Sequence, residues 1–494
     1  MKESGMDHTP LLISAARILG PLLFLVSFFI SSPDANHPHI PVMAGITAWM
    51  AVWWLSESVH LSVTSLLPFI LLPVCGIVDT RIVAAQYMDP IMFLFIGGFF
   101  LAFAIERHGL HERIAGHILV SSGHTVSLVL AGVMSTAWLI SMWISNTATV
   151  MMLIAAVTAL CTRLEDRIGT GEAARKTSSA LLIGLAYAAS IGGMATLVGT
   201  PTNMIFYRSY SEHYGSVEEL TFADWMVFAA PVSLVLLAAT WLLLSRMIPR
   251  EIRSTRLDRS VFRQRLVSLG PISRNERIVG ALFLITALLW FTRSEINIGN
   301  FTFRGWASVF RYGEQIQDGT IAIAISLLLF LIPDSSRRGE RLLEWKDTAR
   351  LPFEILLLFG SGFALSKGFE ASGLSDWLAK ALLSWRDVPT PILVICIGLV
   401  VTLISEFASN VASIQLVLPI LISLQQALDL PPQLLLIPAT LAASCGFMLP
   451  VATAPNTIVF SSGKIKVREM AGIGIMVDLI AIALISGTCI FIFR

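Results

Sequence analysis

Two short polar tracts interrupt apolar stretches of this chain and carry side chains that can bind ions. They are residues 143–149 (WISNTAT) and 407–413 (FASNVAS). Polar residues at membrane depth are costly unless they line a cavity, so paired interruptions at corresponding positions indicate a binding site. Serine, threonine and asparagine offer oxygens that suit a hard cation such as sodium and donors that suit a carboxylate.

A second pair of interruptions follows the first, at residues 199–203 (GTPTN) and 452–456 (ATAPN). Proline removes a backbone donor and clashes with the preceding turn, so each helix should break there. A broken helix exposes carbonyl groups at one stub and N–H groups at the other. The first can bind a cation, and the second can bind a carboxylate.

Each interruption also has a purely structural explanation. Serine and threonine in membrane helices often bond back to the preceding turn, and one tract alone would favour helix packing. Two tracts at equivalent positions, each followed by a Thr-x-x-Asn break, favour a site. Glu406 beside the second tract is expected to brace the hairpin rather than bind a ligand, since its counterpart is Met142. Glu106 and Glu370 are expected to cap or anchor their helices.

The polar tracts lack a basic counter-charge. No Lys or Arg occurs within residues 141–162, 194–207, 403–427 or 446–463. An anion bound there must be neutralised by helix dipoles and co-bound cations, which predicts cation coupling. An Asp/Glu/His relay is missing, which argues against a proton pump. The sequence also has no nucleophile, base or metal constellation that would predict an enzyme.

Composition places these tracts in a membrane. The chain has 494 residues, of which 55% are hydrophobic and only 14% charged, too little polar surface for a soluble globule of this size. A spanning helix needs about 20 apolar residues. Runs of this kind occur near 11–31, 41–59, 61–79, 90–106, 177–212, 222–247, 276–293, 318–333, 352–370, 433–462 and 469–492.

The chain is an internal repeat. One offset aligns Ser145-Asn146 with Ser409-Asn410 and also Gly109 with Gly373, so residues 90–162 map onto 352–427. Residues 125–162 suit a re-entrant hairpin or a broken helix equally by length. The predicted fold is an all-α polytopic membrane protein with about 11 transmembrane helices and two re-entrant hairpins in an inverted repeat.

Basic residues predict the orientation. Nine arginines lie between 246 and 277, and further basic residues lie in 337–350, so these loops should be cytoplasmic. The predicted protein is a multi-pass protein of the cell (inner) membrane with a cytoplasmic N-terminus and an extracytoplasmic C-terminus. The arginines are interpreted as topology determinants that contact the lipid bilayer, in preference to nucleic-acid binding.

At these motifs the chain resembles the divalent anion:sodium symporter family, which carries di- and tricarboxylates or sulfate. Residues 145–147 and 409–411 look like its paired signature, and residues 199–203 and 452–456 like its paired helix breaks. The resemblance covers nearly the whole chain. It implies a homodimer in which a scaffold stays still while the hairpins and broken helices slide as an elevator.

The resemblance also implies how the chain divides. Residues 1–124 would hold the scaffold and interfacial helix of the first repeat, and 125–221 the first transport unit. Residues 222–383 and 384–462 would be the corresponding parts of the second repeat. Residues 463–494 would form a C-terminal transmembrane helix.

Residue by residue, the resemblance implies two sodium sites and a set of carboxylate contacts. The first sodium site would use Ser141, Ser145, Asn146 and Gly199, and the second Ser405, Ala408, Asn410, Ala452 and Thr453. The carboxylate contacts would be Asn146, Thr147, Thr200, Asn410, Val411 and Pro455. The chain departs from the family pattern at Val411, where many members have threonine, and at Thr202, which replaces a proline.

The predicted function is sodium-coupled import of a C4-dicarboxylate such as succinate, malate or fumarate. Its cofactors would be co-transported sodium ions. Alternatives within transport are a sodium-independent dicarboxylate exchanger and a sodium-coupled citrate or sulfate transporter. A carboxylate sensor or channel is a rival from another class, and the broken-helix pairs argue against an open pore. Neutral donors recognise an anion through cavity shape, so residue types leave the anion and the sodium stoichiometry open.

Overall fold

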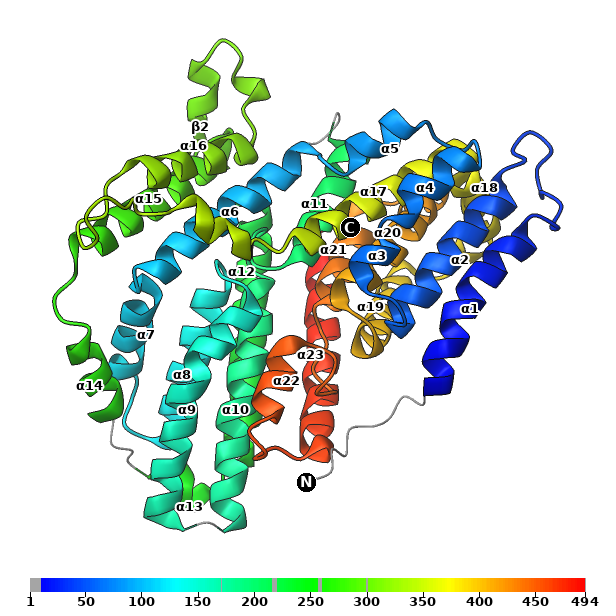
Figure 1. Ribbon diagram of the computed structural model, residues 1–494. Helices are drawn as coiled ribbons and strands as arrows, with labels where there is room; N and C mark the ends of the chain where they lie inside the picture. The colour runs from blue at the N-terminus through cyan, green and yellow to red at the C-terminus, as the bar shows by residue number, and fades with distance from the viewer. Residues whose placement is uncertain (1–9, 170, 216–219, 256–259, 299–300, 494) are drawn as a thin grey trace.

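The computed structural model describes residues 10–169, 171–215, 220–255, 260–298 and 301–493, which are almost entirely helical (Figure 1). Each predicted span coincides with one helix or with a pair of helices. The single helices are α1 (Pro10–Ser27), α2 (Ile40–Ser56), α6 (Pro90–Arg107), α12 (Phe222–Met247), α15 (Arg274–Phe291), α16 (Asp318–Leu331), α17 (Phe353–Ser372) and α23 (Val467–Phe493). The pairs are α3 (Leu61–Thr64) with α4 (Leu67–Val74), α10 (Glu172–Gly193) with α11 (Pro201–Tyr214), and α21 (Pro432–Ala443) with α22 (Ala454–Phe460).

Many of these helices have the length and apolarity of membrane spans. Six helical segments of the described chain are long and apolar enough to cross a membrane. They are Thr80–Arg107, Asn146–Asp166, Phe222–Met247, Thr390–Phe407, Asn410–Leu428 and Val467–Phe493. Shorter apolar helices accompany them, which fits the predicted polytopic membrane protein.

The two polar tracts lie at the tips of helical hairpins. The first joins α8 (Val126–Ser141) to α9 (Asn146–Ile168), and the second joins α19 (Thr390–Phe407) to α20 (Asn410–Leu428). The two arms of each hairpin contact each other, α8 with α9 and α19 with α20. The length of these segments suited a hairpin or a broken helix equally. The structure forms a helical hairpin in both repeats.

The amphipathic segments form separate short helices, α7 (Leu110–Ser121) and α18 (Leu374–Leu382). Both begin after a glycine with left-handed backbone, Gly109 with φ 70° and Gly373 with φ 77°. Residues other than glycine rarely adopt this backbone conformation, which explains why both repeats have glycine at this position.

A small exception to the all-helical fold is an antiparallel pair of strands, β1 (Ile296–Ile298) and β2 (Phe301–Phe303). It projects from the top of the molecule in Figure 1, between α15 and α16. Short helices α5 (Thr80–Gln86), α13 (Arg250–Arg253) and α14 (Ser260–Ser268) and the 3-10 helix η3 (Trp345–Arg350) fill the connections. Of the arginines used to predict orientation, Arg256 and Arg259 lie outside the described residues.

The hairpins and broken helices share one hydrophobic core, which includes the buried side chains of Tyr187, Trp225 and Phe447. Within it α10 contacts α8, α9, α12 and α22, and α21 contacts α19, α20 and α23. A smaller core lies among α2, α4 and α17, around Met43, Trp54 and Leu72. The polar interruptions are therefore held together by the larger core.

Candidate functional site

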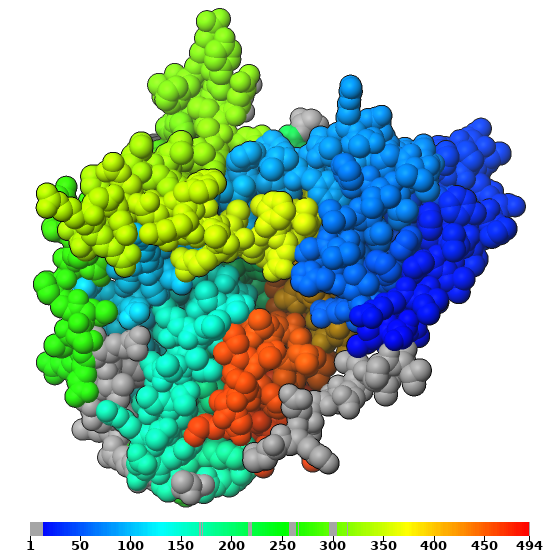
Figure 2. Space-filling model, viewed as in Figure 1, coloured from blue at the N-terminus to red at the C-terminus, as the bar shows by residue number. Residues whose placement is uncertain are grey.

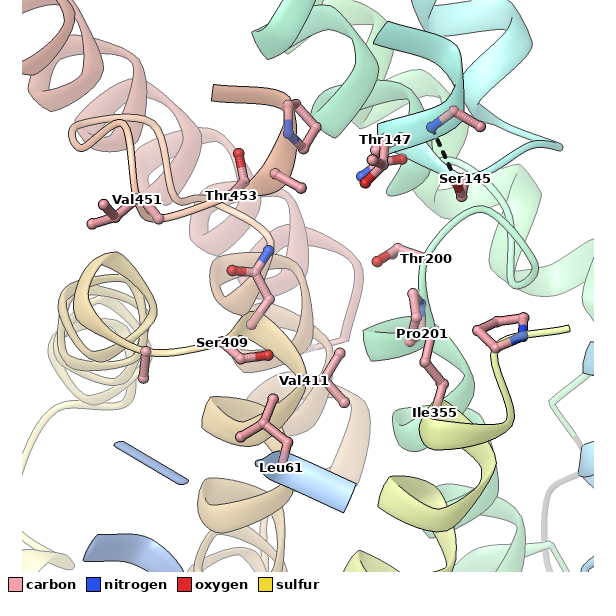
Figure 3. Close-up of a pocket in the computed structure, with 18 of the residues that line it drawn as sticks. Leu61, Ser145, Thr147, Thr200, Pro201, Ile355, Ser409, Val411, Val451 and Thr453 are labelled. Carbon is pink, nitrogen blue, oxygen red and sulfur yellow. Dashed lines mark hydrogen bonds between the residues drawn. The ribbon is translucent and has the colours of Figure 1, made fainter. Parts of the chain in front are cut away.

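The two hairpin tips and the two helix breaks open onto one cavity of about 1050 Å³. In Figure 2 the surface is hollowed where the cyan, orange and yellow-green parts of the chain meet. Figure 3 shows Thr147 and Thr200 on one side of this cavity and Ser409, Val411 and Thr453 on the other. The sequence-predicted residues that line it are Ser145, Asn146, Thr147, Gly199, Thr200, Ala408, Asn410, Val411, Ala452, Thr453 and Pro455.

The first tip is ordered by hydrogen bonds among its own polar groups. Ser145 is the N-cap of α9, and its Oγ accepts a hydrogen bond from Ala148 N at 3.2 Å. Ser141 does not line the cavity but lies fully buried behind it, where its Oγ donates to Asn146 Oδ1 at 2.6 Å. The two oxygens are thus close enough to bind one ion together.

The second tip repeats this pair with one additional oxygen. Ser405 is also fully buried, and its Oγ lies 2.8 Å from Asn410 Oδ1 and 2.6 Å from the carbonyl oxygen of Ala443. A hydroxyl has one hydrogen and cannot donate fully to both acceptors. The three oxygens of this cluster therefore share a single hydroxyl hydrogen. Such an excess of oxygens suits a bound cation. The sequence did not predict the part of Ala443, because its carbonyl is brought in by tertiary packing.

The helix breaks are pinned by the asparagine that ends each Thr-x-x-Asn motif. Asn203 Nδ2 donates to the carbonyl oxygens of Gly193 at 3.1 Å, Met194 at 3.3 Å and Thr196 at 2.8 Å. Asn456 Nδ2 donates to those of Gly446 at 3.0 Å and Leu449 at 3.1 Å. Carbonyl groups left without an intrahelical partner are satisfied in this way. These asparagines shape the breaks and do not line the cavity.

The chain passes close to the first tip where α10 ends. A Cβ atom added to Gly193 would lie 2.5 Å from Asn146 Oδ1, and one added to Gly199 would lie 2.5 Å from the Gly193 carbonyl oxygen. Only glycine permits these approaches. At the second tip the equivalent Gly446 is less crowded, since its nearest neighbours would be Ala452 Cβ at 3.3 Å and Thr453 Cγ2 at 3.4 Å.

The two tips are attached to their helix breaks by different groups. In the first repeat Thr196 Oγ1 donates to the carbonyl oxygen of Met142 at 2.5 Å. In the second, the buried carboxylate of Glu406 accepts from Met448 N at 2.7 Å and Leu449 N at 3.0 Å. Glu406 therefore acts as a brace, as its repeat counterpart led us to expect.

Among the residues that the structure describes, one basic residue lines the cavity, Arg350, whose side chain is 49% exposed. Arg350 Nη1 donates to Glu106 Oε2 at 3.1 Å, and its guanidinium lies 4.8 Å from the ring centroid of Phe103. Arg107 docks the preceding segment against α6 through ion pairs with Asp347 and Glu340. The position of Arg350 could not be predicted from sequence, because it is one of several basic residues in a predicted loop.

Other chemistry is not supported by the described residues. Within them no group of three or more His, Cys, Asp or Glu side chains could hold a metal ion. The oxygens that the tips and breaks present to the cavity are hydroxyl, amide and main-chain groups. The arrangement can bind monovalent hard cations and accept a carboxylate at the helix N-termini.

Comparison with known proteins places the chain among transporters. Residues 14–492 match the family model described as the sodium:sulfate symporter transmembrane region. The sodium-dependent dicarboxylate transporter SdcS of Staphylococcus saprophyticus is 38% identical over 473 residues, covering 95% of this chain and 89% of that protein. SdcS of Staphylococcus aureus is 39% identical over 474 residues, with the same coverage.

Two solved structures share the fold at low sequence identity. Neisseria gonorrhoeae MtrF has a TM-score of 0.59 at 12% identity, covering 99% of this chain and 96% of MtrF. The Alcanivorax borkumensis YdaH transporter has a TM-score of 0.56 at 13% identity, covering 98% of each chain. Both similarities concern the fold alone.

Proposed function

This chain belongs to the sodium:sulfate symporter family of integral membrane transporters, and we propose that it imports C4-dicarboxylates together with sodium across the cell membrane. Two relatives that cover most of the chain are named sodium-dependent dicarboxylate transporters. The observation that carries the proposal is the cavity. Both tips and both breaks contribute to it, and each tip carries a Ser–Asn oxygen pair.

The sodium ions bind behind the two tips. The first site uses Ser141, Ser145, Asn146 and Gly199, and the second uses Ser405, Ala408, Asn410, Ala452 and Thr453. The support is the close approach of a serine and an asparagine oxygen in each repeat. Segments that are pinned at the breaks supply further main-chain oxygens.

The dicarboxylate binds between the tips, in contact with Asn146, Thr147, Thr200, Asn410, Val411 and Pro455. All six line the same cavity. Its single basic lining residue among those described, Arg350, has a half-exposed side chain that already pairs with Glu106. Helix N-termini and the co-bound sodium ions therefore have to neutralise a dianion at the tips, which makes sodium binding a condition for tight substrate binding.

Transport proceeds by an elevator movement of residues 125–221 and 384–462 against residues 1–124 and 222–383. Among the described residues, one ion pair crosses this boundary: Arg208 Nε of α11 lies 2.6 Å from Asp89 Oδ2 at the start of α6, with each side chain only 13% exposed. The Arg208 guanidinium also lies 5.2 Å from the ring centroid of Phe363 in α17. A sliding transport unit has to break these contacts and form others in the second state.

The protein works as a homodimer in the lipid bilayer, with its N-terminus in the cytoplasm and its C-terminus outside. The positive-inside rule supports this orientation. In Figure 1 the arginine-containing α13 and the beginning of α1 lie at the same lower end of the molecule, whereas α23 runs upward from that end. Residues 463–494 form the last transmembrane helix in this arrangement.

Substrate binding with and without sodium tests the function. Purified protein is titrated with succinate, citrate and sulfate in sodium chloride and in choline chloride of equal ionic strength. Succinate affinity is expected to rise with sodium concentration. Equally tight binding in both salts, together with uptake only into vesicles preloaded with dicarboxylate, would identify an exchanger instead. Preferential binding of citrate or sulfate would replace the dicarboxylate.

A further inference from the structure

The cavity has uncharged side chains at the tips and breaks and charged side chains elsewhere on its wall. Among the lining residues that the structure describes, the charged ones are Glu57 at the C-terminal cap of α2, Glu106 in the last turn of α6 and Arg350 at the end of η3. Without Arg350 the lining would carry two carboxylates and no basic group. Such a wall would repel a dianion before the anion reached the tips.

A short segment connects Arg350 to the part of the cavity where the tips meet. Ile355, in the first turn of α17, also lines the cavity. Figure 3 shows Ile355 beside Pro201 and across from Val411. Five residues span at most about 18 Å even when fully extended, so the backbone of Arg350 lies within that distance of Ile355. An anion that moves between solvent and the tips therefore passes through a cavity that Arg350 also lines.

Arg350 is held in a way that lets it exchange one carboxylate for another. Its Nη1 donates to Glu106 Oε2 at 3.1 Å, and its guanidinium lies over the ring of Phe103. A guanidinium has five N–H donors and binds a carboxylate best through two of them. Both members of the pair are half-exposed, and ion pairs of this kind contribute little to stability. A carboxylate that enters from solvent can therefore displace Glu106 at small cost.

We propose that Arg350 binds a carboxylate group of the substrate as the anion enters and leaves the cavity, and that Glu106 competes with the substrate for it. The anion then passes to the tips, where sodium ions and helix N-termini neutralise it. A basic group that steers an anion acts mainly on the association rate. This inference rests on the proposed function and adds to it a residue that selects the anion during entry.

The test measures how fast succinate binds to the purified protein after rapid mixing. Sodium is kept at a saturating concentration, and ionic strength is varied with choline chloride. Arg350→Gln is expected to slow association about tenfold or more and to remove much of its dependence on ionic strength. Glu106→Gln frees the guanidinium from its competitor, so it should speed association. Apparent sodium affinity should stay constant in both variants, because neither residue belongs to the proposed sodium sites.

Two further variants separate direct contact from general charge effects. Arg338→Gln is the matched control, since Arg338 is an exposed arginine of the same connection that does not line the cavity. It should change the association rate little. Arg350→Lys keeps the charge but loses the planar pair of donors, so its rate should lie between those of the wild type and Arg350→Gln.

The opposite signs expected for the two partners make the proposal easy to overturn. Slower association in both Arg350→Gln and Glu106→Gln would mean that the ion pair only supports the structure. Equal rates in Arg350→Gln and Arg338→Gln would mean that Arg350 makes no contact of its own. If Arg350→Gln does not fold, Glu106→Gln alone still decides, because an unchanged or slower rate contradicts the competition. If the wild-type protein does not bind succinate, the proposed function fails, and the same rates measured with citrate or sulfate then test Arg350.

Discussion

The two hairpin tips share a serine–asparagine pair but are attached to the rest of the protein through different groups. In both, a buried serine hydroxyl lies within 2.8 Å of an asparagine oxygen at the start of the second arm. The first tip is attached through a hydroxyl, Thr196 to the Met142 carbonyl, whereas the second uses the Glu406 carboxylate and two amides. On the cavity side Thr147 of the first tip corresponds to Val411 of the second.

This comparison separates what both halves keep from what each half has changed. The serine–asparagine pair and the asparagine at the helix break occur in both repeats. We assign them to two requirements that both repeats share, namely ion binding and a stable break. The brace and the residue after the tip asparagine differ. The substrate cavity is therefore chemically unequal at its two ends, with a hydroxyl at one end and a methyl pair at the other.

The largest effect is expected from removing the shared asparagines. Asn146→Ala and Asn410→Ala should each abolish uptake, because each side chain serves both a sodium ion and a carboxylate in the proposed site. Uptake of radioactive succinate into proteoliposomes measures this effect. Thermal unfolding and size-exclusion profiles like those of the wild type would show that the variants are folded. Normal uptake by either variant would exclude the hairpin tips as the site.

The glycines opposite the tips should separate the two repeats. Gly193→Ala places a Cβ 2.5 Å from Asn146 Oδ1, whereas Gly446→Ala places one 3.7 Å from Asn410 Oδ1. Overpacking costs roughly 1–3 kcal/mol, so Gly193→Ala should weaken apparent sodium affinity about fivefold or more. Gly446→Ala is the matched control and should change it little. Sodium titrations of succinate uptake measure both, and equal effects would contradict the difference between the tips.

Much of this site could be predicted from sequence because polar residues are conspicuous in apolar helices. The tips, the breaks and the glycines before α7 and α18 all recur at one offset or in matching motifs. Length alone could not separate a hairpin from a broken helix, since both bury the same apolar arms. The strands β1 and β2 lie in a connection that has no periodic pattern, and they were not predicted.

Other features depend on tertiary contacts that no local pattern encodes. The Ala443 carbonyl reaches Ser405 only through packing of α21 against α19. Asp478 is a single acid in a long apolar run, and its contact with Glu406 joins segments far apart in the chain. Arg350 reaches the cavity because Arg107 docks the preceding segment. Sequence shows that such residues exist but not what they face.

A smaller difference is expected between the two break asparagines. Asn203 Nδ2 shares its two hydrogens among three carbonyl groups, Asn456 Nδ2 donates to two, and both side chains are fully buried. Leaving buried acceptors without donors costs about 1–3 kcal/mol. Asn203→Ala and Asn456→Ala should therefore both lower the unfolding temperature of the purified protein, and Asn203→Ala should lower it more. An unfolding temperature unchanged by either variant would mean that the break is held by other contacts.

The smallest effect, and the most selective, is expected from making the two ends of the cavity alike. Val411→Thr adds a hydroxyl where the second tip has none, opposite Thr147. A hydrogen bond to a charged group contributes roughly 1.5–3 kcal/mol when well made, which corresponds to about a tenfold or larger change in affinity. If a dicarboxylate lies between the two tips, its affinity should change while the apparent sodium affinity stays nearly constant, because the Val411 side chain offers no oxygen to the ion. Isothermal titration with succinate at several sodium concentrations separates the two effects.

Thr147→Val is the reciprocal variant and should reduce succinate affinity from the other end. An altered sodium dependence with unchanged anion selectivity in Val411→Thr would place the carboxylate at a different tip.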